Sequence, residues 1–191
     1  MRRIIYSVAM SLDGYIAGPN GEYDWIATDP DIDFQTIFDR FDTFVMGRRT
    51  YELVQGQGGG PGMGGKKLIV FSRTLRQTDH PKVTIVNDDP ERVLTELRAQ
   101  PGKDIWLFGG GSLFRSLLDL GQVDALSVAV VPHLLGGGIP FLEPPARQAR
   151  LTLTGHKLYP KTGTMILEYA VEYAEKKAKG RKRLPVAKAR K

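Results

Sequence analysis

Short runs of apolar and β-branched residues recur along the chain, most of them four to eight residues long. Gly, Pro, Asp or Asn bounds each run, which is the pattern that strands leave in a sequence. The runs at 43–46, 68–71 and 105–108 are apolar on both faces, as expected in a parallel sheet that helices cover. Further strands are predicted at 4–8, 83–86, 125–131, 151–156 and 165–171.

The last two of these runs alternate polar and apolar positions. They are separated by a turn-forming stretch at 159–163, which contains Pro160 and Gly163. Alternation is typical of a strand with one solvated face. We therefore predict an antiparallel hairpin at one edge of the sheet.

Helical periodicity appears between the strands. Apolar residues at spacings of three, four and seven predict a helix over 34–41. A second helix is predicted over 90–99, where Pro90 takes a favoured first position, and a Leu-rich third one over 112–120. Alternating strands and helices predict an α/β layered domain with a mainly parallel central sheet.

The net charge of +6 is unevenly distributed. Residues 174–191 carry nine Lys or Arg and one acid, whereas residues 1–173 carry 18 basic and 20 acidic side chains. We predict a folded domain over 1–173 and a basic, disordered tail over 174–191. Seven glycines at 56–65 predict a mobile surface loop.

Composition excludes several kinds of site. The chain has no cysteine, so disulfides, thiolate metal sites and cysteine nucleophiles are absent, and the three histidines are too scattered for a zinc site. No run of 18 apolar residues and no signal-peptide pattern occurs. We expect a cytoplasmic protein that binds neither a metal nor a membrane.

The strand predicted at 105–108 runs into Gly109, Gly110 and Gly111 and then into a helix. Glycines let a ligand approach the backbone, and the free N–H groups of a helix start suit a pyrophosphate. The plain alternative is a tight strand-to-helix turn without a ligand. The spacing is not the G-x-G-x-x-G of an ordinary dinucleotide fold.

Two further strand ends carry groups that suit an anion. Gly47, Arg48, Arg49 and Thr50 follow the strand at 43–46. Arginines are unfavourable at a helix start unless an anion is near, although solvated surface charge is the alternative. After 68–71, Ser72 and Arg73 are suited to a phosphate ester such as the 2′-phosphate of NADP. Ligands of open α/β sheets bind at this edge, so we predict one anionic ligand across the three strand ends.

The segment after the first strand combines a Gly- and Asn-rich loop, which contains Asp13, with an aromatic residue, Trp25. Such a loop can cover a site. A carboxylate near an aromatic ring can bind a heterocycle or assist protonation, although most of these acids can instead cap helices. The acids after the loop are Asp24, Asp29, Asp31 and Asp33. Of these, Asp33 directly precedes the helix predicted over 34–41 and is expected to be its N-cap.

Five motifs occur in a fixed order along the chain, at 11–17, 46–51, 71–73, 108–111 and 131–138. As a set, over residues 2–172, they resemble the dihydrofolate reductase-like superfamily. Within it, the chain is most similar to stand-alone relatives of the reductase domain of the riboflavin-biosynthesis deaminase/reductase. This resemblance implies a three-layer fold with a mainly parallel sheet of about eight strands, a C-terminal antiparallel hairpin, and NADPH as the hydride donor.

The resemblance also implies residue roles. It places the cofactor phosphates at 47–50 and 109–113, the adenosine at 72–73, and the nicotinamide at Ala9, Ile16 and Ala17. The implied cofactor-binding residues are Ala9, Ile16, Ala17, Gly47, Arg48, Arg49, Thr50, Ser72, Arg73, Gly109, Gly110, Gly111, Ser112 and Leu113.

For the substrate, the resemblance implies Asp13, Trp25 and Asp31, with Asp31 as the catalytic carboxylate. Asp29 and Asp33 are close enough to exchange places with Asp31 in an alignment. The implied function is an NADPH-dependent reductase, working as a homodimer, that transfers hydride to a pterin- or pyrimidine-like heterocycle. The chain has Gly109 where riboflavin reductases usually have Glu, so the resemblance leaves the identity of the heterocycle open.

The basic tail favours a second function. Runs of Lys and Arg attract nucleic acid without sequence specificity. The alternative is therefore a nucleotide- or nucleic-acid-binding protein that uses residues 174–191 and does not turn over a substrate. A solubilising tail without a partner accounts for the same residues.

Overall fold

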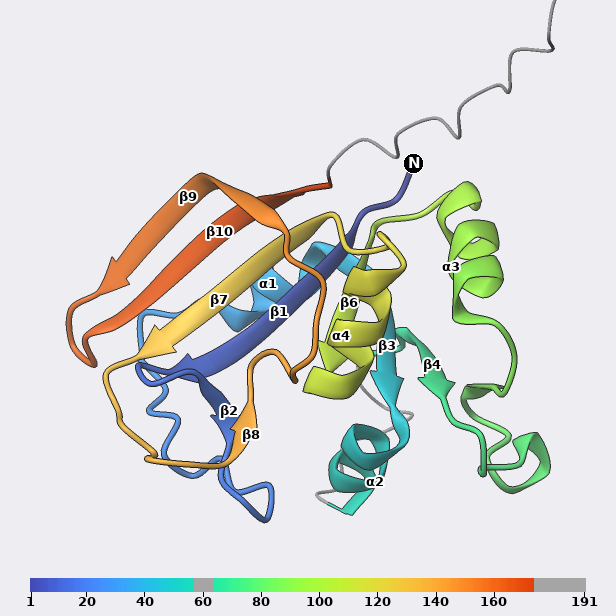
Figure 1. Cartoon of the computed structure of the whole chain (residues 1–191), viewed down its shortest axis with the longest axis horizontal. Helices are drawn as coiled ribbons and strands as arrows, with labels where there is room; N and C mark the ends of the chain where they lie inside the picture. Colours follow the sequence, from blue (N-terminus) through green and yellow to red (C-terminus); the bar gives the residue numbers. More distant parts are fainter. Residues whose placement is uncertain (57–63, 174–191) are drawn as a thin grey trace, which may run out of the picture.

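The computed structural model describes residues 1–56 and 64–173. Its central element is one large sheet (Figure 1), whose strands are β1 (Ile4–Ser11), β3 (Phe41–Gly47), β4 (Lys67–Phe71), β5 (Thr84–Val86), β6 (Asp104–Gly109), β7 (Ala125–Val131), β9 (Arg150–Tyr159) and β10 (Thr164–Glu172). The eight strands are ordered β5-β4-β3-β6-β1-β7-β10-β9.

In this order, the strands from β5 through β4, β3, β6 and β1 to β7 all run parallel to one another. Strand β10 is antiparallel to both of its neighbours, β7 and β9. The predicted mainly parallel sheet of about eight strands is thereby confirmed, and so is the antiparallel hairpin at its edge. Two short strands were not predicted: β2 (Tyr15–Ala17) and β8 (Ile139–Pro140), which form a separate two-stranded sheet. Strands this short carry too few residues to show a period of two.

Helices cover both faces of the sheet. They are α1 (Phe34–Asp39), α2 (Arg48–Gly56), α3 (Pro90–Ala99) and α4 (Gly111–Asp119), with a 3-10 turn η1 (Gln77–Asp79). In Figure 1, α4 lies in front of the sheet and α1 behind it. One core cluster contains apolar side chains of α3 and α4, and the other contains Tyr51 of α2 with Ile37 and Phe38 of α1.

The ends of the helices follow from local chemistry. The side chain of Asp33 accepts the Thr36 N–H at 3.0 Å and caps α1, as the sequence predicts. Asp89 caps α3 in the same way, with Pro90 in its first turn. The predicted helix at 34–41 is two residues too long, because Phe41 is 1% exposed and already belongs to β3.

Two predictions fall on parts of the chain that the structure does not describe. The basic tail at 174–191 lies outside the described residues, as does most of the predicted mobile loop, at 57–63. No helix within 1–56 and 64–173 is long and apolar enough to cross a membrane.

Candidate functional site

Three glycine- or arginine-bearing strand ends lie side by side in the sheet. Strands β4, β3 and β6 are consecutive neighbours and run parallel, so their carboxyl ends meet at one edge. Gly47 is in register with Phe71, and Met46 with Gly109. The edge that the sequence assigns to one anionic ligand is therefore continuous.

The start of α4 has no side-chain cap. Gly110 is its N-cap residue, and no side chain caps the first N–H groups. A Cβ on Gly111 would lie 2.8 Å from the carbonyl oxygen of Pro140, so only glycine fits there. Thr50 of α2 leans against the same turn, with its hydroxyl 3.5 Å from where a Cβ of Gly110 would be. No side chain therefore accepts a hydrogen bond from the first backbone N–H groups of this helix.

The neighbouring turn after β4 is held by Ser72. Its Oγ accepts hydrogen bonds from the N–H groups of Thr74, at 3.2 Å, and Leu75, at 3.0 Å. Arg48 at the start of α2 donates to the Thr74 hydroxyl at 2.8 Å, which ties the two strand exits together. Arg49 and Arg73 are exposed at this edge. Exposed guanidinium groups beside a helix start are suited to phosphate oxygens.

The small β2–β8 sheet brings two more of the predicted cofactor residues, Ile16 and Ala17, close to this edge. Ala17 pairs with Ile139, and Tyr15 pairs with Pro140. Gly138 has a φ of 143° and lies so close to Ala17 that a Cβ would overlap the Ala17 carbonyl oxygen. Since Pro140 also contacts the start of α4 at Gly111, β8 connects Ile16 and Ala17 with the glycine turn.

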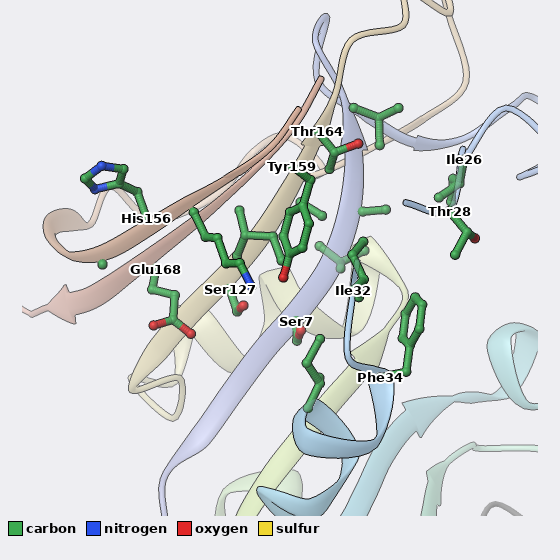
Figure 2. A pocket seen from close by; sticks show the side chains of 18 of the residues that line it. Ser7, Ile26, Thr28, Ile32, Phe34, Ser127, His156, Tyr159, Thr164 and Glu168 are labelled. Carbon is green, nitrogen blue, oxygen red and sulfur yellow. The ribbon is translucent and has the colours of Figure 1, made fainter. Parts of the chain in front are cut away.

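A cavity of about 420 Å³ opens beside Ala9, on the face of the sheet that carries α1 (Figure 2). Strands β1, β7, β9 and β10 form its floor, and residues 26–34 with α1 form its opposite wall. This volume lies in the range of small-molecule sites. Because Ala9 is one of the residues implied for the nicotinamide, the cavity adjoins the predicted cofactor edge.

The floor of the cavity combines an apolar and a polar row. Ala9 is in register with Ala129, which is in register with Ile166. In the next row, Ser7 pairs with Ser127, which pairs with Glu168. Register partners on adjacent strands point to the same face. Figure 2 shows Ser7, Ser127 and Glu168 on this floor.

The structure places Asp31 outside the lining of the cavity. Its carboxylate accepts a hydrogen bond from Lys161 Nζ at 2.7 Å, and both side chains are more than half exposed. Its neighbour Ile32 does line the cavity. The catalytic role implied for Asp31 therefore stays a prediction, and its carboxylate faces the β9–β10 turn.

Asp29 holds the 26–34 segment through more hydrogen bonds than Asp31 does. It is fully buried, and its carboxylate accepts the N–H and the hydroxyl of Thr162, both at 3.0 Å, and the Asp31 N–H, also at 3.0 Å. Burial acts to raise the pKa of Asp29, but these hydrogen bonds outweigh it, and the pKa lies below its ordinary value. Asp29 thus fastens one wall of the cavity to the turn at Thr162.

Asp13 and Trp25 fasten the 12–25 loop instead of lining the cavity. Asp13 accepts hydrogen bonds from the Ser11 hydroxyl at 2.6 Å and the Gly136 N–H at 2.7 Å. The Ser11 hydrogen bond, with those from the loop backbone, lowers the pKa of Asp13 to about 2. Trp25 stacks on His133, with 5.9 Å between the ring centroids. Their predicted contact with a substrate stays a prediction.

Sequence reasoning missed the polar groups that do line the cavity. These include Arg40, Ser127 and Glu168. A glutamate inside the apolar run at 165–171 is the one indication that the sequence carries. The face to which it points depends on how β9 and β10 join the sheet, which the pattern of one strand does not reveal.

Comparison with known proteins agrees with this architecture. A family model described as the RibD C-terminal domain matches residues 2–164. The chain is 38% identical over 152 residues to the uncharacterized protein YyaP of Bacillus subtilis (strain 168), a match that covers 73% of this chain and 80% of YyaP.

Solved structures show the same arrangement. A putative riboflavin biosynthesis protein from Shewanella sp. PV-4 is 25% identical, with a TM-score of 0.77 over 91% of this chain and 100% of that one. Dihydrofolate reductase from Enterococcus faecalis, complexed with NADP(H), is 17% identical with a TM-score of 0.66, over 90% of this chain and 97% of that one. At this identity the second likeness shows the fold alone.

The strand order and the likeness to solved structures define a dihydrofolate reductase-like fold. Within that class, the chain belongs to the family of the RibD C-terminal domain, whose model covers most of its length.

Proposed function

We propose that this protein is an NADPH-dependent reductase that transfers hydride to a small pterin- or pyrimidine-like heterocycle. One observation carries the proposal: three adjacent strand ends combine exposed arginines with the uncapped start of α4, and a cavity of about 420 Å³ opens on the same sheet beside Ala9. An extended, multiply charged dinucleotide needs the row of strand ends, and the heterocycle that it reduces needs the cavity.

The residues present fit the cofactor. The uncapped first turn of α4, which begins at Gly111, would hold the pyrophosphate. Arg49 and Arg73 would contact the phosphate of the adenosine half, and Ala9 and Ala17 would flank the nicotinamide. NADPH supplies the hydride when bound.

The chain's own contribution is position and exclusion of water. The floor of β1, β7 and β10 and the wall at 26–34 hold a flat ring between them. Asp29 keeps that wall in place through its hydrogen bonds to Thr162. Fixing the ring beside the nicotinamide removes orientational freedom that the reaction would otherwise have to overcome.

The test is Gly110→Asp, followed by NADPH fluorescence. Gly110 has a φ of −89°, which any residue adopts, and Asp is a favourable N-cap residue. The new carboxylate would therefore preserve α4 but occupy and repel the phosphate site. We expect NADPH affinity to fall by about a hundredfold or more, since two like charges would share one site.

The matched control is Gln100→Asp, which adds the same charge at the exposed C-cap position of α3. We expect it to bind NADPH like the unchanged protein. Equal affinity of Gly110→Asp and the unchanged protein would overturn the proposed cofactor site. Screening pterins and pyrimidines for NADPH oxidation then identifies the substrate.

A further inference from the structure

Glu168 is the only carboxylate among the cavity-lining residues that the structure describes. Its Oε1 accepts a hydrogen bond from Arg40 Nη1 at 2.9 Å. Its Oε2 receives no hydrogen bond from the residues within 1–56 and 64–173. The carboxylate thus lines the cavity with one oxygen engaged and one available. Figure 2 shows Glu168 beside Ser127.

The strand pairing is distorted at this residue. Glu168 is in register with Gly155, but Tyr169 is in register with Leu153, so β9 contains one extra residue at this point. Such bulges redirect a side chain and are common beside functional sites. A Cβ on Gly155 would lie 3.2 Å from Oε2 of Glu168. Glycine inside a strand therefore gives the carboxylate its space.

Ser127 and Ser7 continue the polar row away from Glu168 across β7 and β1. A hydroxyl can donate or accept, whereas an ionised carboxylate only accepts. The apolar row of Ala9 and Ala129 runs alongside. A few polar groups in an otherwise apolar cavity are the arrangement that fixes the orientation of a small ligand.

A purely structural role for the Arg40–Glu168 ion pair explains fewer of these features than a role in ligand binding. The side chains of Arg40 and Glu168 are 40% and 37% exposed, and exposed pairs contribute little to stability. Such a pair needs neither a bulge nor a glycine opposite it. Arg40 also balances the charge of the carboxylate, so a neutral ring is a better partner for Oε2 than a second cation.

We propose that Glu168 determines substrate specificity by accepting, at Oε2, a hydrogen bond from an N–H donor on one edge of a neutral heterocycle, while Ser127 contacts the next polar atom of the ring. The inference rests on the proposed function, because it takes this cavity as the substrate site. It narrows the substrate class to neutral rings whose bound edge carries an N–H donor.

The test compares two probes of similar size by ligand-observed NMR titration. Isocytosine can present an amino group beside a ring N–H, whereas 1,3-dimethyluracil has no N–H group. We expect the unchanged protein to prefer isocytosine, and Glu168→Gln to lower isocytosine affinity about tenfold while 1,3-dimethyluracil binding changes less than about twofold.

Two variants separate recognition from structure. Arg40→Gln removes the ion pair but keeps the carboxylate, so we expect it to retain the preference for isocytosine. Glu172→Gln changes an exposed residue of the same strand that does not line the cavity, and should bind both probes like the unchanged protein.

Equal affinity of the unchanged protein for the two probes, or no isocytosine binding, would overturn the inference. It would also be overturned if Glu168→Gln weakened both probes equally, or neither. The titrations contain no NADPH, so they fail or succeed separately from the cofactor site. If the unchanged protein did not bind NADPH in a separate titration, the proposed function would be overturned instead.

Discussion

Two tyrosine hydroxyls in the core have opposite surroundings. Tyr6 is 0% exposed and its ring stacks on Phe114 at 4.1 Å, but its hydroxyl finds no hydrogen-bond partner among the described residues. Burial raises the pKa of Tyr6. The Tyr173 hydroxyl, in contrast, donates to the Val123 carbonyl at 2.7 Å and accepts the Val123 N–H at 3.1 Å.

Replacement by Phe therefore has opposite expected effects at the two positions. Tyr6→Phe removes an unpaired buried hydroxyl and should raise the free energy of unfolding by about 1 kcal/mol. Tyr173→Phe breaks two hydrogen bonds and should lower it by about 1–2 kcal/mol. Urea denaturation measures both values. A destabilised Tyr6→Phe would contradict the packing described for β1.

The Asp13 carboxylate makes loop stability depend on pH. Its pKa is lowered from 3.8 to about 2, chiefly by the Ser11 hydroxyl and also by N–H donors at Leu135 and Gly136. A lowered folded-state pKa gives stability that is present above the unfolded value and is lost as pH falls through the folded value. Asp13 therefore stabilises the fold above about pH 4 and ceases to do so near pH 2.

Asp13→Asn should accordingly melt at a lower temperature than the unchanged protein at neutral pH. The difference should shrink as the pH falls from about 4 to about 2. Thermal denaturation monitored by circular dichroism across this range measures it. Asp24→Asn, an exposed acid in the same segment, is the control. A difference that is constant with pH would show that the Asp13 hydrogen bonds contribute no pH-dependent stability.

At the level of elements, the sequence predicted helices and turns best where a hydrophobic period ends at a residue that favours a helix end or a turn. Helix α3 has its predicted bounds because Pro90 starts it after a capping aspartate. The glycine turn at 109–111 was recognisable because a strand runs directly into it. The cavity could not be recognised from the sequence, because its walls come from β9, β10 and the 26–34 segment. The placement of these parts relative to one another depends on tertiary contacts such as that between Asp29 and Thr162.

That contact is itself testable. Thr162→Val removes the hydroxyl that donates to Asp29 while keeping the shape of the side chain. We expect it to lower the free energy of unfolding by about 1–2 kcal/mol, since the acceptor is a buried charge. It should also weaken isocytosine binding, because the cavity wall loses an attachment. Unchanged stability and binding would show that the turn does not fasten the wall.

Asp31→Asn examines the implied catalytic carboxylate on the same segment. Lys161 engages Asp31 at the surface, so we expect NADPH affinity to stay unchanged and turnover of a reducible heterocycle to fall less than about tenfold. Loss of a general acid typically costs a hundredfold or more. A loss of that size, without a change in melting temperature, would assign proton transfer to Asp31.

For the whole molecule, the charge distribution separates the reductase proposal from the nucleic-acid alternative. Residues 174–191 hold nine of the 27 basic side chains and only one acid. Deleting this segment should leave the NADPH dissociation constant within about twofold, because the proposed cofactor edge lies on β3, β4 and β6. Salt-dependent DNA binding, if the full chain shows it, should disappear. A large loss of NADPH affinity would place the tail in the cofactor site.

The most direct measurement is a crystal structure of the full chain soaked with NADPH. We expect one extended cofactor along the carboxyl ends of β4, β3 and β6, with its pyrophosphate at the first turn of α4 and its nicotinamide beside Ala9. A cofactor bound elsewhere, or strand ends at 47–50, 72–74 and 109–113 that contact no cofactor, would contradict it.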